Sequence, residues 1–188
     1  RVPQDGRIRL HINDRDVEFR VSTLPLRDHE KVVMRVLDTG GSALALEKLG
    51  YKSRNLDVIN RNVAKPNGML LVTGPTGSGK TLVADFIIDK HKDDDWRIIY
   101  TAPIKALSNQ KYKDFSKEYG EDVVGLMTGD IVINPHAKVL IMTTEIYRNM
   151  VVSNDEEVKD VAYVIFDEVH YINDIERGYV WEESIIYS

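Results

Sequence analysis

The residues best suited to chemistry lie in one glycine-rich segment of the chain. Its order, Gly74-Pro75-Thr76-Gly77-Ser78-Gly79-Lys80-Thr81, matches the phosphate-binding pattern G-x-x-x-x-G-K-[ST]. The glycines allow the backbone N–H groups to point inward, and the positive end of a following helix adds to this anion site. Lys80 would neutralise phosphate charge, and the Thr81 hydroxyl would hold Mg²⁺. The segment predicts binding of ATP or ADP with Mg²⁺; the alternative is a glycine-rich turn that matches by accident.

Two carboxylates follow the apolar run at residues 164–166. In a phosphate-loop enzyme, an Asp at the end of such a strand holds Mg²⁺, which assigns that role to Asp167. The next residue, Glu168, is the candidate catalytic base, because a carboxylate there can take a proton from the attacking water. The competing interpretation is a strand that simply ends in polar residues.

The elements that would position these residues alternate between strands and helices from Met69 onward. Expected strands cover residues 69–72, 97–101, 123–127, 139–143 and 162–166, and expected helices cover 81–91 and 105–119, with a helical stretch ending at 161. This alternation predicts an α/β fold with a mostly parallel sheet covered by helices. Residues 67–188 are therefore expected to form one phosphate-loop (P-loop) NTPase lobe.

The first third of the chain has a different pattern. Apolar and polar residues alternate over 8–12 and again over 17–21, on either side of a polar turn, which predicts a β-hairpin with one dry face. Further expected elements are a strand at 31–37, a short helix at 43–49 closed by Gly50, a helix through Leu56, Ile59 and Val63 with Asn55 as N-cap, and a turn at 66–68. Residues 1–66 are therefore expected to form a small β-rich α+β subdomain.

Composition narrows the functional classes. The chain has 188 residues, no cysteine and a net charge of −5. Disulfide, thiolate and cysteine-zinc chemistry are excluded, and the negative balance argues against a dedicated nucleic-acid domain. No apolar run has the length of a membrane span, and no signal peptide is visible, so we expect no membrane partner and, for a natural protein, a cytoplasmic location.

Several segments after Thr81 share one further pattern. They are residues 101–111 (TAPIKALSNQK), 125–130 (GLMTGD), 143–145 (TTE), 167–170 (DEVH), 176–178 (ERG) and 181–183 (WEE). Over about residues 81–188 they resemble the first motor domain of exosome-associated DExH RNA helicases. The resemblance implies a RecA-like fold, ATP as the nucleotide and RNA-backbone contacts from Pro103, Lys105, Ser108, Gln110 and the turn 143–145. It also implies that His170, which couples nucleotide to a second motor domain in that family, is idle here.

Residues 1–81 carry a different resemblance. The segments 2–8 (VPQDGRI), 20–25 (RVSTLP), 33–38 (VMRVLD) and 67–80 (NGMLLVTGPTGSGK) resemble assembly ATPases of the type II secretion and type IV pilus class. In that family, arginines of the N-terminal subdomain reach nucleotide across the subunits of a ring. This would give Arg7, Arg9 and Arg20 a role, but a solvated hairpin face explains the same residues.

The two resemblances meet inside one motif. We interpret the chain as a chimera of two phosphate-loop ATPases, joined near residues 80–82 and engineered or recombined in the laboratory rather than inherited as a natural gene. In the helicase fold a further strand, which this sequence lacks, lies between the phosphate-loop strand and the acidic strand. Three outcomes are expected. The phosphate-loop strand and the acidic strand pair directly, another strand of the chain takes the place between them, or a second copy of the chain donates a strand there by swapping and gives a homo-oligomer.

The function expected from these observations is binding of ATP or ADP with Mg²⁺ and slow ATP hydrolysis, because no arginine finger is assured. One alternative is a non-catalytic recombined fold whose site is vestigial. The other is a helicase fragment that binds single-stranded RNA weakly, through half of an RNA track. Unwinding is not expected, since it needs two motor domains that move against each other.

Overall fold

The computed structural model describes residues 2, 4–12, 15–26, 29–38, 46, 51–65, 68–74 and 78–188. Backbone contacts divide the chain into two units, residues 1–42 and 43–188. The expected boundary lay between residues 66 and 67, whereas the observed division leaves helix α1 (Ser53–Val63) in the second unit. In the part of the chain that is described, no helix is long and apolar enough to cross a bilayer.

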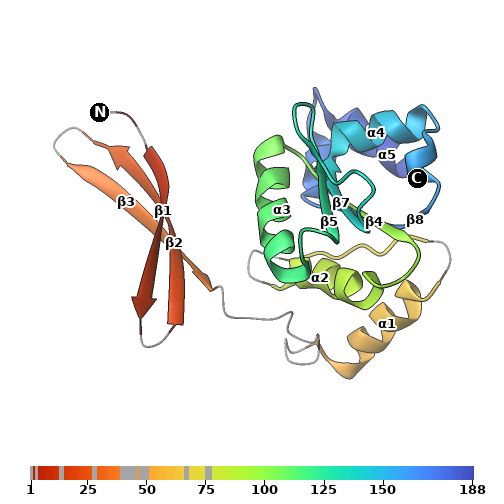
Figure 1. Cartoon of the computed structure of the whole chain (residues 1–188), viewed down its shortest axis with the longest axis horizontal. Helices are drawn as coiled ribbons and strands as arrows, with labels where there is room; N and C mark the ends of the chain where they lie inside the picture. Colours follow the sequence, from red (N-terminus) through yellow and green to blue (C-terminus); the bar gives the residue numbers. More distant parts are fainter. Residues whose placement is uncertain are drawn as a thin grey trace. The chain divides into compact units, whose positions relative to one another are not determined.

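The first unit contains a three-stranded antiparallel sheet. Its strands are β1 (Gln4–Ile12), β2 (Arg15–Pro25) and β3 (Glu30–Asp38), in the order β1-β2-β3 (Figure 1). The predicted hairpin and third strand are confirmed, with Ile8 opposite Phe19 and Phe19 opposite Val36. The apolar face is not dry within the described residues of this unit, because Ile8 and Val36 remain 41% and 60% exposed. Residues 39–45 and 47–50, which include most of the short helix expected at 43–49, lie outside the described residues.

The second unit is built on a five-stranded sheet in the order β6-β5-β7-β4-β8. Its strands are β4 (Arg97–Ala102), β5 (Val124–Met127), β6 (Val132–Ile133), β7 (Val139–Thr143) and β8 (Val161–Phe166). All pairings are parallel except that of the short edge strand β6, so the expected mostly parallel sheet is confirmed. Strand β4 lies beside β8, so its C-terminal end is next to the acidic pair that follows β8.

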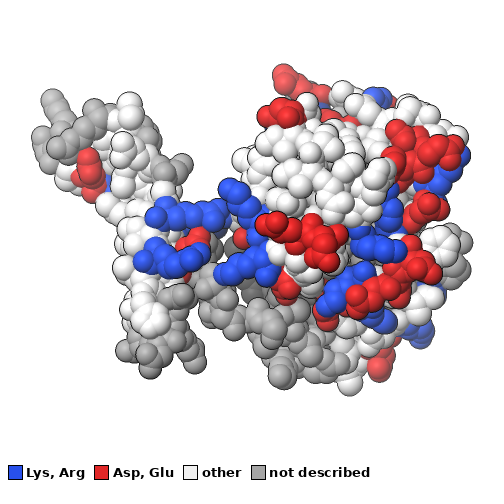
Figure 2. All heavy atoms as spheres, viewed as in Figure 1, with Lys and Arg blue, Asp and Glu red and all other residues white. Residues whose placement is uncertain are grey.

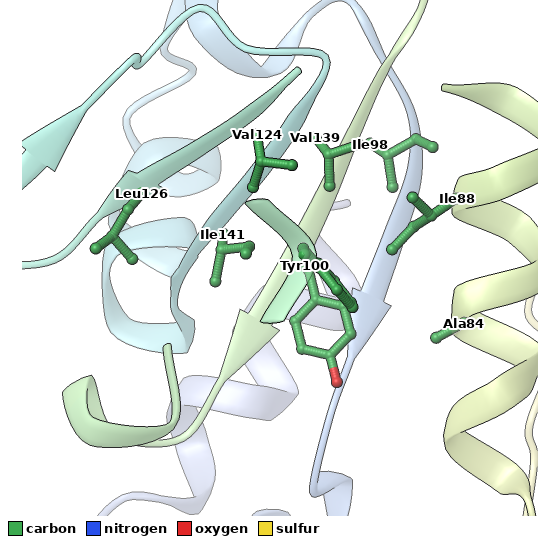
Figure 3. Close-up of a cluster of buried hydrophobic side chains, with 9 residues drawn as sticks. Ala84, Ile88, Ile98, Tyr100, Val124, Leu126, Val139 and Ile141 are labelled. Atoms are coloured by element: carbon green, nitrogen blue, oxygen red, sulfur yellow. The ribbon is translucent and has the colours of Figure 1, made fainter. Parts of the chain in front are cut away.

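Helices cover both faces of this sheet, because the buried strands carry apolar residues on both faces. Helices α2 (Lys80–His91) and α3 (Lys105–Tyr119) pack on one face, against Ile98, Tyr100 and Ile141 (Figure 3). Helix α4 (Thr144–Val152) packs on the other face, and α5 (Gly178–Ile186) contacts α4. Short 3₁₀ turns at Glu156–Val158 and Val169–Asn173 flank β8.

Helix α2 carries apolar residues on two sides. One side packs on the sheet, and the other is covered by α1. Val83 of α2 packs with Ile59 and Val63 of α1 and with Leu46. The hydroxyl of Tyr163, on β8, donates a 2.9 Å hydrogen bond to the Val63 carbonyl. Helix α1 begins at Ser53, so Asn55 lies in its first turn and is not the expected N-cap. These contacts explain why α1 belongs with the phosphate-loop lobe.

The expected strand at Met69–Val72 is not formed. Residues 68–74 have no strand or helix, and Met69 and Leu71 are 72% and 66% exposed. Among the described residues, β8 pairs only with β4, so β8 is a sheet edge. The prediction was wrong because an apolar run forms a strand only beside a partner. Among the described residues, no strand therefore pairs with β8 on the side away from β4, and the two strands have not closed up.

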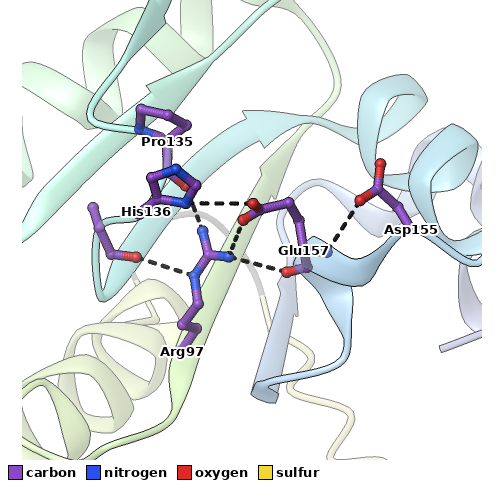
Figure 4. A network of polar contacts seen from close by, with 6 residues as sticks. Arg97, Pro135, His136, Asp155 and Glu157 are labelled. Atoms are coloured by element: carbon purple, nitrogen blue, oxygen red, sulfur yellow. Dashed lines mark hydrogen bonds and ion pairs between the residues drawn. The ribbon is translucent and has the colours of Figure 1, made fainter.

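Arg97, the first residue of β4, holds the N-terminal ends of the strands in place. Its guanidinium donates to the carbonyls of Ala137, Pro135 and Glu157 at 3.3, 2.5 and 3.0 Å, and to the Glu157 carboxylate at 2.7 Å (Figure 4). His136 also contacts that carboxylate, at 3.3 Å. Arg97 thereby ties the loop before β7 and the turn before β8 to the start of β4.

Candidate phosphate and metal site

The phosphate-loop segment ends where α2 begins. Gly79 has a φ of +81°, in the left-handed region, and the helix starts at Lys80. Glycine adopts this conformation without steric cost, so the chain can turn sharply into the helix. The first N–H groups of any α-helix have no intrahelical acceptor, and here they belong to the segment that the sequence assigned to phosphate. Pro75, Thr76, Gly77 and the Lys80 side chain lie outside the described residues.

The described ends of the loop approach each other closely. A Cβ placed on Gly74 would lie 2.5 Å from Oγ of Ser78, a distance that real Cβ atoms do not reach. A larger residue at position 74 would therefore require the Ser78 side chain to move. The same close approach is what a cradle of inward-facing N–H groups requires.

One stripe of α2 faces the sheet, and Thr81 belongs to it. Figure 3 shows Ala84 and Ile88 pointing from α2 to the sheet, with Ile88 toward Ile98 and Ala84 toward the hydroxyl end of Tyr100. Thr81 precedes Ala84 by three positions, so it lies on the same face, one turn nearer the helix start. The helix therefore carries Thr81 toward the C-terminal ends of β4 and β8.

Asp167 stands directly after β8, and three groups around it fix its position. Its backbone N–H donates to the Thr101 carbonyl at 3.0 Å. Its Oδ2 accepts a 2.6 Å hydrogen bond from the Tyr100 hydroxyl, and its Oδ1 accepts a 2.9 Å bond from the Glu168 N–H. Each carboxylate oxygen accepts more than one bond, so both oxygens keep a direction open for water or a cation.

Glu168 has a φ of +51°, which is uncommon for a residue with a side chain. Its carboxylate is exposed and lies 3.1 Å from Nδ1 of His170. Sequence reasoning expected His170 to be idle, but the structure places this imidazole beside the proposed base. Uncommon backbone conformations of this kind occur often at functional sites, and this one stands next to the Asp that is expected to hold the metal.

Two residues of this site escaped sequence reasoning. Asp85 lies one turn after Thr81, and burial raises its pKa from 3.8 to about 6, opposed by Lys111 and assisted by Glu118 and Asp167. Its Oδ1 has no hydrogen-bond partner among the described residues. Tyr100 is 1% exposed, and burial together with Asp167 and Asp85 raises the pKa of its hydroxyl. The available signal was the polar Asp85 within the apolar sequence of α2.

The donors at this site fit Mg²⁺. Thr81 and Asp167 offer a hydroxyl and a carboxylate, the hard oxygen ligands that this ion prefers. Among the described residues, no group of three or more His, Cys, Asp or Glu side chains could hold a metal by itself. That pattern suits Mg²⁺, which proteins usually bind through one or two side chains, several waters and the phosphates of a nucleotide.

A hollow of about 450 Å³ opens beyond the C-terminal ends of β4 and β7. It gathers four of the residues expected to contact RNA, together with Arg177; the four are Pro103, Lys105, Thr143 and Glu145. Arg177 donates to the Pro103 carbonyl at 2.7 Å and pairs with Glu145.

The other residues expected on the RNA track are held elsewhere. Ser108 and Thr144 are buried and bond backbone carbonyls, while Gln110 bonds Asp114. Lys105, which does line the hollow, pairs with Asp130 at 2.9 Å. Figure 2 shows basic and acidic side chains interspersed on the visible face of this unit, with no continuous basic track on that face.

Arg7, Arg9, Arg20 and Arg35 share one face of the sheet in the first unit. Arg7 lies opposite Arg20, and Arg20 lies opposite Arg35, so three guanidinium groups form one row across the strands. Glu18 pairs with Arg7 at 3.1 Å and with Arg9 at 3.4 Å. Like charges at directly paired positions repel, so this row lowers the stability of the sheet. Glu18 offsets part of that repulsion at Arg7.

Comparison with known proteins decides the family. The family model described as "DEAD/DEAH box helicase" matches residues 56–187, and the model described as "Type II/IV secretion system protein" matches residues 1–103. The chain belongs to both families. The two matched regions overlap over residues 56–103, which include the phosphate-loop segment and α2. As a DEAD/DEAH box helicase relative, the second unit has the P-loop NTPase fold.

Curated relatives of the helicase part are similar over about 117 residues. The ATP-dependent RNA helicase mtr4 of Schizosaccharomyces pombe is 55% identical over 62% of this chain and 10% of its own length. The DExH-box ATP-dependent RNA helicase DExH9 of Arabidopsis thaliana is 54% identical over 62% of this chain and 12% of its own. Human Superkiller complex protein 2 is 53% identical, again over 62% of this chain. The chain spans 9% to 12% of the length of these relatives.

A solved structure agrees with the fold. The Pyrococcus furiosus Hef helicase domain superposes with a TM-score of 0.51, at 24% identity, over 72% of this chain and 32% of that chain. At this identity the likeness concerns the fold alone. It agrees with a P-loop lobe whose central sheet is flanked by helices.

Proposed function

We propose that the chain binds ATP or ADP with Mg²⁺ at the junction of α2 and β8. The observation that carries the proposal is the position of Asp167, which hydrogen bonds hold at the end of β8, toward which α2 directs Thr81. Backbone N–H groups of residues 77–81 would hold the phosphates, and Lys80 would neutralise their charge. Thr81 and Asp167 would hold Mg²⁺, which when bound supplies charge stabilisation for phosphoryl transfer.

We propose slow hydrolysis as the reaction. Glu168 would orient the attacking water and accept its proton, with His170 beside it at 3.1 Å. No arginine contacts Asp167 or Glu168 among the described residues, and an arginine at the γ-phosphate supplies a factor of about 10³–10⁵ in phosphate-loop enzymes. Glu168→Gln is expected to keep nucleotide binding and abolish phosphate release.

The test is calorimetric titration of ATP and ADP in the presence of Mg²⁺. The unchanged chain is compared with Lys80→Ala and with Lys90→Ala, a matched control at the far end of the same helix. Binding that is lost only in Lys80→Ala supports the proposal. Absence of binding in the unchanged chain would instead support the alternative of a recombined fold whose site is vestigial.

A second candidate function is weak binding of single-stranded RNA at the hollow beside Pro103. The observation in its favour is that the hollow gathers Lys105, Thr143 and Arg177, although Asp130 and Glu145 already pair with the two cations. Binding of a labelled RNA should weaken as salt rises, because contacts to phosphates release counterions. Lys105→Ala should weaken it further, whereas Lys113→Ala, two turns along the same helix and exposed, should not.

For the origin of the chain, we propose an engineered or recombined fusion of a secretion-type ATPase and a helicase, joined within residues 80–82. The two overlapping family matches support this proposal. A natural chain of this kind would act in the cytoplasm. The open edge of β8 also supports a strand-swapped homo-oligomer, which light scattering on the purified chain would detect as twice the monomer mass.

A further inference from the structure

The hydroxyl of Tyr100 is the buried group that touches the Asp167 carboxylate. The two residues lie on neighbouring parallel strands, and the register of β4 and β8 pairs Tyr100 with Ile165 and Thr101 with Phe166. Tyr100 is 1% exposed, and its hydroxyl lies 2.6 Å from Oδ2 of Asp167. A short bond between a neutral donor and an ionised acceptor is stronger than a neutral one.

The Tyr100 ring is itself held in place. It meets the Phe115 ring edge-on at a centroid distance of 5.4 Å, and the Lys111 ammonium lies 5.3 Å from its centroid. Two residues of α3 therefore fix the ring that carries the hydroxyl. The ring therefore presents its hydroxyl to Asp167 from a fixed position in the core.

Mg²⁺ demands near-ideal octahedral geometry, so the orientation of a ligand carboxylate matters as much as its presence. The Asp167 side chain can rotate about its Cα–Cβ and Cβ–Cγ bonds. The Glu168 N–H restrains Oδ1 at 2.9 Å, but Glu168 itself lies on an exposed turn. Tyr100 restrains the other oxygen from the packed core. With the hydroxyl removed, Oδ2 would turn toward water.

We infer that Tyr100 is a positioning residue for the proposed metal site, and that its hydroxyl fixes the Asp167 carboxylate in the orientation that holds Mg²⁺ beside the phosphates. The inference rests on the proposed function, since it assumes that Asp167 meets the metal. It assigns Tyr100 no contact with nucleotide. The residue acts through Asp167 alone, so its loss should affect the metal-dependent part of nucleotide binding.

The test measures ADP affinity with Mg²⁺ and again with EDTA, for the unchanged chain and for Tyr100→Phe. This substitution removes one oxygen and leaves the ring packing in place. Residues that orient a metal ligand typically change metal affinity by about 10- to 100-fold, so the Mg²⁺-dependent gain in affinity should fall by about that factor. Affinity in EDTA should stay unchanged. The control is Tyr147→Phe, which removes another buried hydroxyl, 2.9 Å from Ser188 Oγ and on the opposite face of the sheet.

The possible results distinguish the role of Tyr100 from the proposed binding of nucleotide with Mg²⁺. A Mg²⁺-dependent gain that is full in the unchanged chain and in Tyr147→Phe but reduced about 10- to 100-fold in Tyr100→Phe supports the inference. A gain of unchanged size in Tyr100→Phe overturns the inference and leaves the proposed function standing. Absence of any Mg²⁺ effect in the unchanged chain overturns both.

A second probe does not depend on the folding of the phenylalanine variant. Incorporation of 3-fluorotyrosine at position 100 keeps the hydroxyl and the packing. The fluorine resonance should shift when Mg²⁺ is added to the ADP complex, because the hydroxyl bonds a carboxylate that meets the metal. A resonance that moves on ADP binding but not on Mg²⁺ addition would contradict the inference.

Discussion

Asp85 allows the energetics of this site to be tested without any ligand. Burial raises the pKa of its carboxyl from 3.8 to about 6 in the folded chain. The folded state therefore binds the proton more tightly than the unfolded state does. Its contribution to the free energy of unfolding is most favourable below pH 3.8 and is lost as pH rises through about 6. At pH 8 the folded chain holds a buried, ionised Asp85.

The expected magnitude follows from that difference. A rise from 3.8 to about 6 corresponds to at most about 3 kcal/mol, and less in practice because part of the side chain still meets water. Asp85→Asn should therefore raise the free energy of unfolding by about 1–3 kcal/mol at pH 8 and leave it nearly unchanged at pH 4. The reason is that asparagine removes the cost of ionisation while keeping the shape of the side chain.

The assay is urea denaturation followed by circular dichroism at intervals between pH 4 and pH 8. Asp89→Asn, one helical turn further along α2, serves as the control, because Asp89 is exposed and pairs with Lys92 at 2.7 Å. Stability of the unchanged chain and of the control should decline over this range more steeply than that of Asp85→Asn. Parallel profiles for all three chains would show that Asp85 does not titrate with a raised pKa and would refute the reasoning.

Three further predictions concern the frame around the site. Arg97→Ala should destabilise the second unit by about 2–4 kcal/mol, because three carbonyls and a carboxylate lose their donor, whereas the exposed His136→Ala should cost less than about 0.5 kcal/mol; thermal denaturation measures both. Gly74→Ala should weaken nucleotide binding in calorimetry, because its Cβ would lie 2.5 Å from the Ser78 hydroxyl oxygen and would displace that side chain, while Gly6→Ala, with no atom within 4 Å, should bind normally. Arg20→Thr should stabilise the first sheet by about 0.2–1 kcal/mol, because it removes the middle charge of a row of like charges; a lower midpoint in guanidinium would argue against this.

Much of the second unit could be predicted from the sequence, because its elements have strong local patterns. The predicted helix at Lys105–Tyr119 and strand at Val139–Thr143 agree with the structure at both ends. Helices α4 and α5 were not predicted, since neither has a clear boundary signal in the sequence. The helical end expected over residues 156–161 is instead a 3₁₀ turn at Glu156–Val158, and β8 begins at Val161. The strand at Met69–Val72 was predicted in error, because hydrophobicity indicates that a segment can be buried but not whether a neighbour exists to bury it.

The phosphate loop, Thr81 and the acidic pair of the candidate site could be predicted from the sequence, but the buried residues behind them could not. Asp167 and Glu168 could be named because two carboxylates follow an apolar run. Tyr100 could not, because its role depends on the parallel register of β4 and β8, which a single sequence does not contain. Asp85 was missed for a related reason, since its burial results from the packing of α2 against the sheet.

The open edge of β8 has a consequence for hydrogen exchange. The Asp167 N–H donates to β4, and amides along a strand alternate in direction, so those of Tyr163 and Ile165 also face β4. The amides of Val164 and Phe166 face the empty side and should exchange with solvent much faster than their neighbours. A strand added at this edge, from the same chain or from another, would slow those two amides first. The alternating exchange pattern of one short strand therefore reports whether the sheet is complete.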